Sequence, residues 1–222
     1  MPATGKRSKP VTPIPPDLPV LTPADPGDGF AETSEIQERA FTGGDLSHPD
    51  LYAVSLDGCR LDSVRFSGAM RMGTIADCEL DVCDLANLLA DESSMFRCAI
   101  STSRLTGMSW TAGVWRNISV ASTRADLTSF AYSKLQTVVF RECDLRQADF
   151  ADVEFRDVVF EDCDLSGGRF HHARIQQNVQ FRNCTLTGLV GASGLRGATV
   201  DGGDLLGLAA CLAQEAGISV EW

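Results

Sequence analysis

Cysteine is the residue type in this 222-residue chain that most invites a chemical role, because eight thiols could ligate a metal, form disulfides or supply a nucleophile. Acidic residues flank Cys143 and Cys163, but adjacent side chains of an extended chain point to opposite faces. Thiols and carboxylates therefore cannot converge on one ion. Seven cysteines share one local setting, two residues before a large apolar residue: Cys59, Cys78, Cys83, Cys98, Cys143, Cys163 and Cys184. We interpret them as small hydrophobic residues of a core, with Cys211 outside the pattern.

Histidine offers no better catalytic constellation. The chain has three, His48, His171 and His172, and no nucleophile motif, phosphate-binding loop or zinc-ligand spacing accompanies them. We therefore predict surface histidines, no catalytic, metal or cofactor-binding residues, and a protein that is not an enzyme.

Acidic side chains suggest a different chemistry, the binding of a basic protein surface. The net charge is −11, and residues 1–30 are balanced, which leaves 16 of the 19 basic and 27 of the 30 acidic residues in the remainder. Such a body repels nucleic acid and anionic lipid. The alternative is that the acidity only maintains solubility. The predicted partner-binding wall consists of Glu142, Asp144, Asp149, Glu154, Glu161, Asp162 and Asp164.

The elements that position these residues follow from a five-residue period. Large apolar residues recur at every fifth position for about a hundred residues, up to Ile175. A period of five fits neither a helix nor a flat strand, and it requires a chain that turns a corner every five residues. With four corners per turn, residues twenty apart stack. The predicted core ladder is Trp110, Phe130, Phe150 and Phe170.

The segments Cys143-Asp144-Leu145, Ala148-Asp149-Phe150 and Cys163-Asp164-Leu165 resemble the A(D/N)LXX unit of the pentapeptide repeat family. The resemblance covers residues 41–205, about three quarters of the chain, with slips in register at Ala69–Gly73 and Gln176–Gln180. It implies an all-β solenoid, a right-handed quadrilateral parallel β-helix, and the length corresponds to about eight coils.

Three segments are expected. Residues 1–33 hold eight of the nine prolines, include P-x-x-P patterns and cannot join a sheet ladder, so we predict a disordered, partly polyproline II tail. Residues 34–203 form the β-helix. Residues 204–222 form a C-terminal helical cap, with Asp204 as N-cap, the helix running to about Ala216, and Gly217 after the C-cap.

The predicted cap helix has two apolar faces. Leu205, Leu208, Ala209, Leu212 and Ala216 form one face, which we expect to cover the last coil. The other face is surplus and suggests a homodimer; the alternatives are fraying of the helix or a close-packed tail over Ile218–Trp222 that covers this face. The predicted dimer contact consists of Leu206, Ala210 and Ala213.

The absence of a secretory signal or a long apolar span indicates a cytoplasmic protein with no membrane partner. The family includes proteins that protect DNA gyrase from quinolones by imitating duplex DNA, and so contribute to antibiotic resistance. The resemblance therefore implies a non-enzymatic rod that binds a basic protein groove, with gyrase as a candidate partner and no direct contact with nucleic acid. The alternative is a scaffold whose partners have no connection to topoisomerases.

Overall fold

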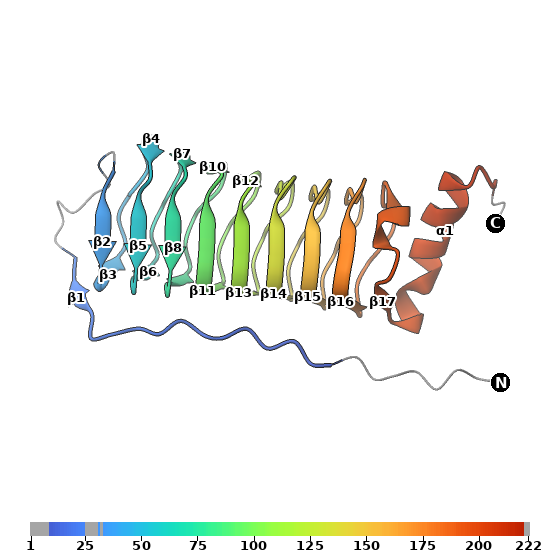
Figure 1. The fold of residues 1–222 in the computed structure, drawn as a ribbon, viewed down its shortest axis with the longest axis horizontal. Coiled ribbons are helices and arrows are strands. Elements are labelled where there is room, and N and C mark those ends of the chain that lie inside the picture. The colour runs from blue at the N-terminus through green and yellow to red at the C-terminus, as the bar shows by residue number, and fades with distance from the viewer. Residues whose placement is uncertain (1–8, 25–30, 32, 220–222) are drawn as a thin grey trace.

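The chain folds into a straight rod of parallel strands, a β-solenoid of about nine turns closed at one end by a helix (Figure 1). The computed structural model describes residues 9–24, 31 and 33–219. The predicted fold class is confirmed, with about nine turns where about eight were expected. The strands are β1 (Thr22–Pro23), β2 (Glu35–Gln37), β3 (Arg39–Thr42), β4 (His48–Tyr52), β5 (Ser55–Asp57), β6 (Arg60–Asp62), β7 (Gly68–Arg71), β8 (Thr74–Ala76), β9 (Glu79–Asp81), β10 (Leu89–Asp91), β11 (Ser94–Ser101), β12 (Ser109–Thr111), β13 (Val114–Ala121), β14 (Lys134–Arg141), β15 (Glu154–Glu161), β16 (Arg174–Arg182) and β17 (Thr199–Val200).

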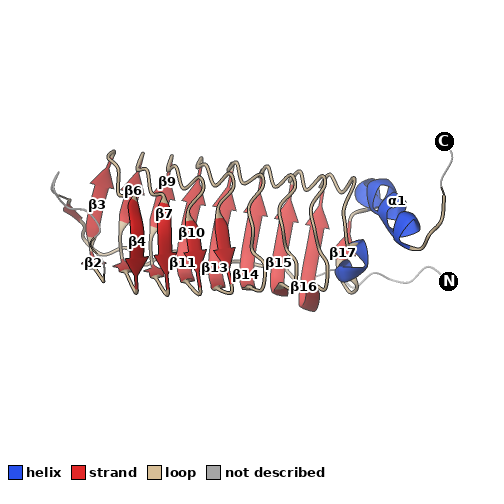
Figure 2. Cartoon of the chain, turned by 90° about the horizontal axis from the view of Figure 1, so that it is seen from above, coloured by secondary structure: helices blue, strands red, loops and turns tan. Residues whose placement is uncertain are grey.

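The strands stack in register along the rod axis (Figure 2). β11, β13, β14, β15 and β16 pair in parallel in that order within a 13-stranded sheet that wraps two adjacent sides of the rod. β12, β10, β7 and β4 form a four-stranded sheet on a third side. The fourth side is held by isolated bridges, among them Asp144 with Asp164. Each pairing joins residues about twenty positions apart, which is one turn.

The corners of the rod lie at residues with positive φ, and these recur every five residues. Arg97, Thr102, Gly107, Ala112 and Asn117 mark five successive corners, with φ between 48° and 68°. This conformation costs a residue other than glycine on the order of 1 kcal/mol. Four corners in twenty residues make the rod four-sided, as the five-residue period predicts.

The predicted slips in register correspond to two irregularities. Gln176 is an extra residue in β16, because Phe155 pairs with Ile175 whereas Arg156 pairs with Gln177. The first irregularity lies where it was predicted: His48 pairs with Gly68 whereas Leu51 pairs with Met70, so β7 has one residue fewer than β4.

The interior contains columns of stacked side chains. Phe150 lies between Phe130 and Phe170, with ring centroids 5.4 and 5.1 Å apart and rings nearly parallel to both. Trp110 occupies the preceding turn of this column, but it packs edge-on against Trp115 at 5.7 Å. These five side chains are fully buried. Successive turns therefore place aromatic rings at the spacing of the strands themselves.

The C-terminal end of the rod is closed by η1 (Ala192–Leu195), η2 (Gly202–Asp204) and α1 (Leu205–Glu215). The side chain of Asp204, at the predicted N-cap, does not cap its own helix but accepts a hydrogen bond from the Cys184 amide at 2.7 Å. Gly217 has φ 73°, as expected of the residue after a C-cap.

Two further helix side chains bind the last turn. The Leu189 amide donates to Cys211 Sγ at 3.1 Å, and the Glu215 carboxylate accepts the amides of Ala192 and Ser193. Burial alone would raise the pKa of Glu215, but the amide donors around Ser193 lower it overall. The helix thus satisfies amides that the open edge of the solenoid would otherwise leave without partners.

The N-terminal segment differs from its expected disorder where the structure describes it. Residues 9–24, which we call the strap, are extended and run along the rod toward β1 (Figure 1). β1 pairs in parallel with β3, through Thr22 with Arg39 and Pro23 with Ala40. Proline has no amide donor, so a proline-rich segment cannot form a long ladder of sheet hydrogen bonds. It favours the polyproline II conformation instead, and a few hydrogen bonds to the rod can hold such a segment in place. Residues 1–8, 25–30 and 32 of the predicted tail lie outside the described residues.

Candidate protein-binding surface

The acidic residues predicted to form one wall are distributed over several sides of the rod. Asp144 and Asp164 are bridged neighbours on one side, and Glu142 and Asp162 lie at the corner preceding that side. Glu161, in β15, adjoins the same corner. A step of five residues is a quarter turn, so residues spaced by five project from successive sides.

The two remaining acids of the predicted wall therefore lie elsewhere. Asp149 is bridged to Arg169 on the next side, and Glu154, in β15, faces outward on the side after that. The structure thus brings together five of the seven predicted residues: Glu142, Asp144, Glu161, Asp162 and Asp164.

Arginines compensate several of these charges. Arg146 forms two hydrogen bonds to Asp144, of 2.8 and 2.7 Å, and this contact lowers the pKa of the Asp144 carboxyl. Glu161 is paired with Arg141 at 2.8 Å on one side and with Arg182 at 3.7 Å on the other. The column of Arg141, Glu161 and Arg182 alternates in the sign of its charges, so it contributes little to a negative surface.

A different set of carboxylates forms no ion pair with an arginine among the described residues. Glu142 accepts a hydrogen bond from the Ser122 hydroxyl, and Asp162 accepts one from the Asn183 amide. Both donors are neutral. Among the described residues, neither carboxylate has an ion-pair partner within 4.0 Å.

Two more carboxylates without an ion pair among the described residues, Asp62 and Asp81, lie in earlier turns next to the corner of Glu142 and Asp162. Asp62 and Asp81 are register partners in the column that continues through Ser101 to Arg141. Their hydrogen-bond donors are the hydroxyls of Ser63 and Ser101. Neither has an ion-pair partner in the described part of the chain. We call Asp62, Asp81, Glu142 and Asp162 the acidic edge.

Sequence reasoning missed Asp62 and Asp81. The available signal was the repeated pair of a leucine followed by an aspartate, Leu61-Asp62 and Leu80-Asp81, at equivalent places in the five-residue period. A residue that follows an inward-facing leucine in a strand points outward. Aligning the repeats by turn would have found this pair.

The cysteines lie where the period predicts, inside the rod. All eight are free and buried, including Cys211, which lies on the buried face of the cap helix. Hydrogen bonding with the Cys143 thiol, together with burial, raises the pKa of Cys163 to about 12. Cys163 Sγ donates to the main-chain oxygens of Phe140 and Glu161. Within the described residues, no three histidine, cysteine or acidic side chains form a group that could hold a metal ion.

The cap helix exposes an apolar face, but its composition differs from the predicted one. Leu208 and Cys211 are buried against the last turn, whereas Leu205 and Leu206 are 55% and 66% exposed. Leu212 is exposed as well. Of the predicted dimer residues, Leu206 lies on the exposed face, and Ala210 and Ala213 are half-buried.

The register and corners define a four-sided β-solenoid built from five-residue units. A family model described as the pentapeptide repeat region matches residues 93–170 and 133–190. The chain thus contains a pentapeptide repeat region, which this match places at residues 93–190. No curated protein sequence matches it significantly. None of the helices among the described residues has the length and hydropathy needed to span a membrane.

Two solved structures illustrate the similarity. A trypsin-treated variant of QnrB1, a plasmid-mediated fluoroquinolone resistance protein, is 22% identical, with 88% of this chain and 96% of that chain covered, at a TM-score of 0.35. HetL, a pentapeptide repeat protein involved in heterocyst differentiation regulation from the cyanobacterium Nostoc sp. strain PCC 7120, is 13% identical, with 74% and 88% covered, at a TM-score of 0.31. TM-scores this low say nothing about shared function.

Proposed function

We propose that this protein is a non-enzymatic, protein-binding rod whose acidic edge docks against a basic surface of a partner protein. The observation that carries the proposal is the acidic edge itself. Its four carboxylates are oriented by neutral donors and lack ion-pair partners among the described residues. Carboxylates held in this way are preorganised to meet arginine or lysine side chains of a second protein.

The net charge of the chain indicates how closely the rod could imitate duplex DNA. At about 4.8 Å per turn, nine turns span about 43 Å. Duplex DNA of that length carries about 25 charges, at one per roughly 1.7 Å, whereas this whole chain carries −11. The rod therefore reproduces less than half the charge density of a duplex. We expect it to occupy part of a basic groove that normally takes DNA. Its binding affinity should depend less on salt concentration than that of DNA.

DNA gyrase is the first partner to test, because the family that the repeats resemble includes proteins that protect it. The assay is supercoiling by purified gyrase with and without a quinolone and this chain. We expect micromolar concentrations of the chain to restore activity in the presence of the quinolone. No effect at these concentrations would discard gyrase as the partner.

The acidic edge is tested by a matched pair of variants. One variant neutralises the edge, with Asp62→Asn, Asp81→Asn, Glu142→Gln and Asp162→Asn. The control removes the same charge elsewhere on the rod, with Glu35→Gln, Glu38→Gln, Asp91→Asn and Glu92→Gln. We expect the edge variant to need at least about tenfold more protein for the same effect, a change of about 1.4 kcal/mol in binding. Equal loss in both variants would show that only total charge matters.

We also propose that two copies associate through the cap helix. Leu205, Leu206 and Leu212 present a leucine-rich face beside the end of the rod. A two-fold contact there would bury the same leucines from both copies and lengthen the rod. Leu206→Glu should convert a dimer to a monomer in sedimentation, and Tyr132→Glu, at a distant exposed position, should not. A monomeric unsubstituted chain at micromolar concentration would exclude the dimer.

A further inference from the structure

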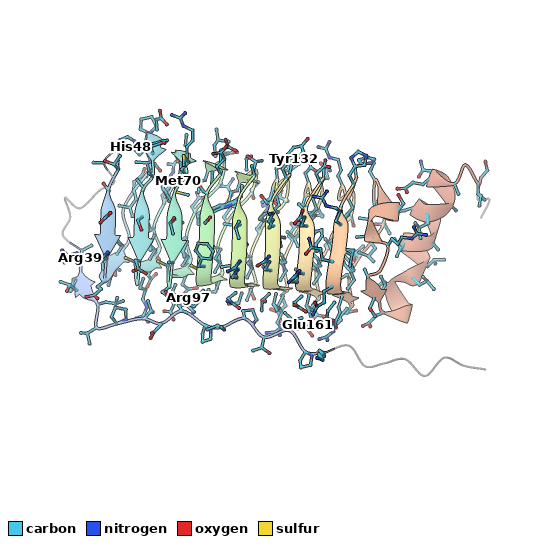
Figure 3. All side chains as sticks on the ribbon, viewed as in Figure 1. Arg39, His48, Met70, Arg97, Tyr132 and Glu161 are labelled. Carbon is cyan, nitrogen blue, oxygen red and sulfur yellow. The ribbon has the colours of Figure 1, made fainter. Side chains whose placement is uncertain are left out.

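The strap follows one corner of the rod and is held by side chains of turns that are not adjacent. Asn178 and Gln180 donate their side-chain amides to the Lys9 carbonyl oxygen, at 3.2 and 3.1 Å. Farther along, the Ile14 amide donates to Asn117 Oδ1 at 3.4 Å, and the Asp17 amide donates to Asp77 Oδ1 at 3.0 Å. Figure 3 shows the strap and its side chains along the side of the rod where Arg97 and Glu161 are labelled.

The spacing of these contacts matches a polyproline II helix. Three residues separate Ile14 from Asp17, and their acceptors Asn117 and Asp77 lie two turns apart. Three residues of polyproline II advance about 9.3 Å, and two turns of the rod advance about 9.6 Å. Between these two contacts, one turn of the strap therefore fits two turns of the rod.

The rod surface beneath the strap is adapted to be covered. Val139 and Val159 are register partners at outward-facing positions, yet they are 9% and 3% exposed. Gln180 is the next residue of this column and is 2% exposed. The contacts at Lys9 and Ile14 lie on either side of these turns, so residues 10–13 of the strap pass over the two valines.

The corner at Asp77 anchors the strap electrostatically. Its carboxylate is buried, accepts the Asp17 amide and forms a bidentate ion pair with the Arg97 guanidinium. The contact with Arg97 lowers the pKa of Asp77. The acceptor is therefore ionised and fixed in place at neutral pH.

We propose that this surface is a docking site for extended proline-rich segments, which the strap occupies in this structure and which a proline-rich segment of another molecule can enter when the strap leaves. We call it the strap site and define it by Asp77, Asn117, Val139, Val159 and Gln180. A polyproline II ligand suits it because its backbone is already extended and loses little entropy on binding. The ligand needs free amides at two positions three residues apart and a small apolar residue that reaches the valines.

The strap's own occupancy should control access. A segment tethered to the rod competes at an effective concentration on the order of millimolar. Between Lys9 and β1, the described strap residues donate two amide hydrogen bonds to side chains of the rod, so a free segment should bind the same surface reversibly. A partner would thus bind poorly while the tether is intact.

The experiment uses the full chain with a protease recognition site inserted between Asp25 and Gly29. The chain is purified folded, cut, and passed through a sizing column at low concentration to remove the released segment. A fluorescent peptide of residues 9–24 is then titrated with cut and uncut protein, and anisotropy is measured. We expect saturable binding to the cut protein and at least about tenfold weaker binding to the uncut protein. No binding to the cut protein, or equal binding to both, would overturn the proposal.

Two controls separate specific docking from adhesion. A peptide with Ile14→Pro and Asp17→Pro keeps the polyproline II conformation but lacks both amide donors, and we expect its binding to be at least tenfold weaker. In the rod, Val159→Asp should abolish peptide binding, whereas Leu127→Asp, at the diagonally opposite corner, should not. If the Val159 variant does not fold, the peptide comparison alone decides. Equal binding of both peptides would overturn the assignment of the site.

Discussion

The interior and the exterior of this rod obey opposite stacking rules. Inside, like lies over like, as in the column of Phe130, Phe150 and Phe170. Outside, the same one-turn spacing brings charges together, and opposite charges compensate them: Arg146 pairs with the stacked Asp144 and Asp164, and Arg141, Glu161 and Arg182 alternate in sign. Apolar rings gain from contact with identical neighbours, whereas identical charges repel. The uncompensated carboxylates of the acidic edge are departures from the outer rule, which is why they suggest function rather than stability.

The largest expected effect tests the inner rule. Phe150→Ala removes a ring that contacts Phe130 and Phe170 and leaves a cavity that a rigid column cannot fill. We expect the free energy of unfolding to fall by about 3–5 kcal/mol, measured by urea denaturation. Tyr132→Ala, at a corner residue that is 68% exposed, should change it by less than about 0.5 kcal/mol. A loss below about 1 kcal/mol at Phe150 would contradict stacking as the source of stability.

The next effect tests the end of the rod, where the interior columns meet the cap helix. Asp204→Ala removes the acceptor of the Cys184 amide and should cost about 1–3 kcal/mol. Asp201→Ala is the control, because the structure gives that exposed side chain no hydrogen bond among the described residues. Thermal unfolding by circular dichroism measures both. Equal melting temperatures would show that water replaces Asp204 at no cost.

A smaller effect concerns pH. The pKa of Glu215 is lowered in the folded chain, so its contribution to stability is present above the ordinary value of 4.5 and is lost as the pH falls through the lowered value. We expect the difference in melting temperature between the unsubstituted chain and Glu215→Gln to be present at pH 6 and to shrink toward pH 3. Glu92→Gln serves as the control at an exposed corner. A difference that does not change with pH would contradict the role of the Glu215 charge.

The smallest effect tests the outer rule. Glu161→Arg would place three positive charges in the column with Arg141 and Arg182, and should cost a few tenths of a kcal/mol. Adding Arg141→Glu restores one pair and should recover part of the loss. Both the loss of stability and its partial recovery should be smaller in high salt, because the pairs are solvent-exposed. A salt-independent loss would indicate a packing defect rather than charge repulsion.

The fold was predictable because the five-residue period constrains the interior at every turn. Phe150 and Cys163 must point inward whichever partner the protein binds. The exterior was less predictable, since Asp144 and Asp149 look adjacent in sequence but lie a quarter turn apart on different sides. The cap helix carries leucines on most of its surface, so its pattern did not decide whether Leu205 or Cys211 meets the rod.

The strap was the least predictable element. Before β1 its prolines keep it out of the sheet, and its contacts there depend on the distance between turns rather than on any local preference. The signal that sequence reasoning overlooked lies in the rod: valine at outward positions 139 and 159, where most other turns have polar or small residues. An apolar residue at such a position needs a cover.

The ratio of three strap residues to two turns limits how this protein can grow over evolutionary time. Duplication of a single repeat of twenty residues between Asn117 and Asp77 would displace the anchoring amides by one and a half residues, so no donor would face its acceptor. Lineages that lengthen the rod under the strap are therefore expected to gain turns in pairs, each pair accompanied by three additional residues near the N-terminus.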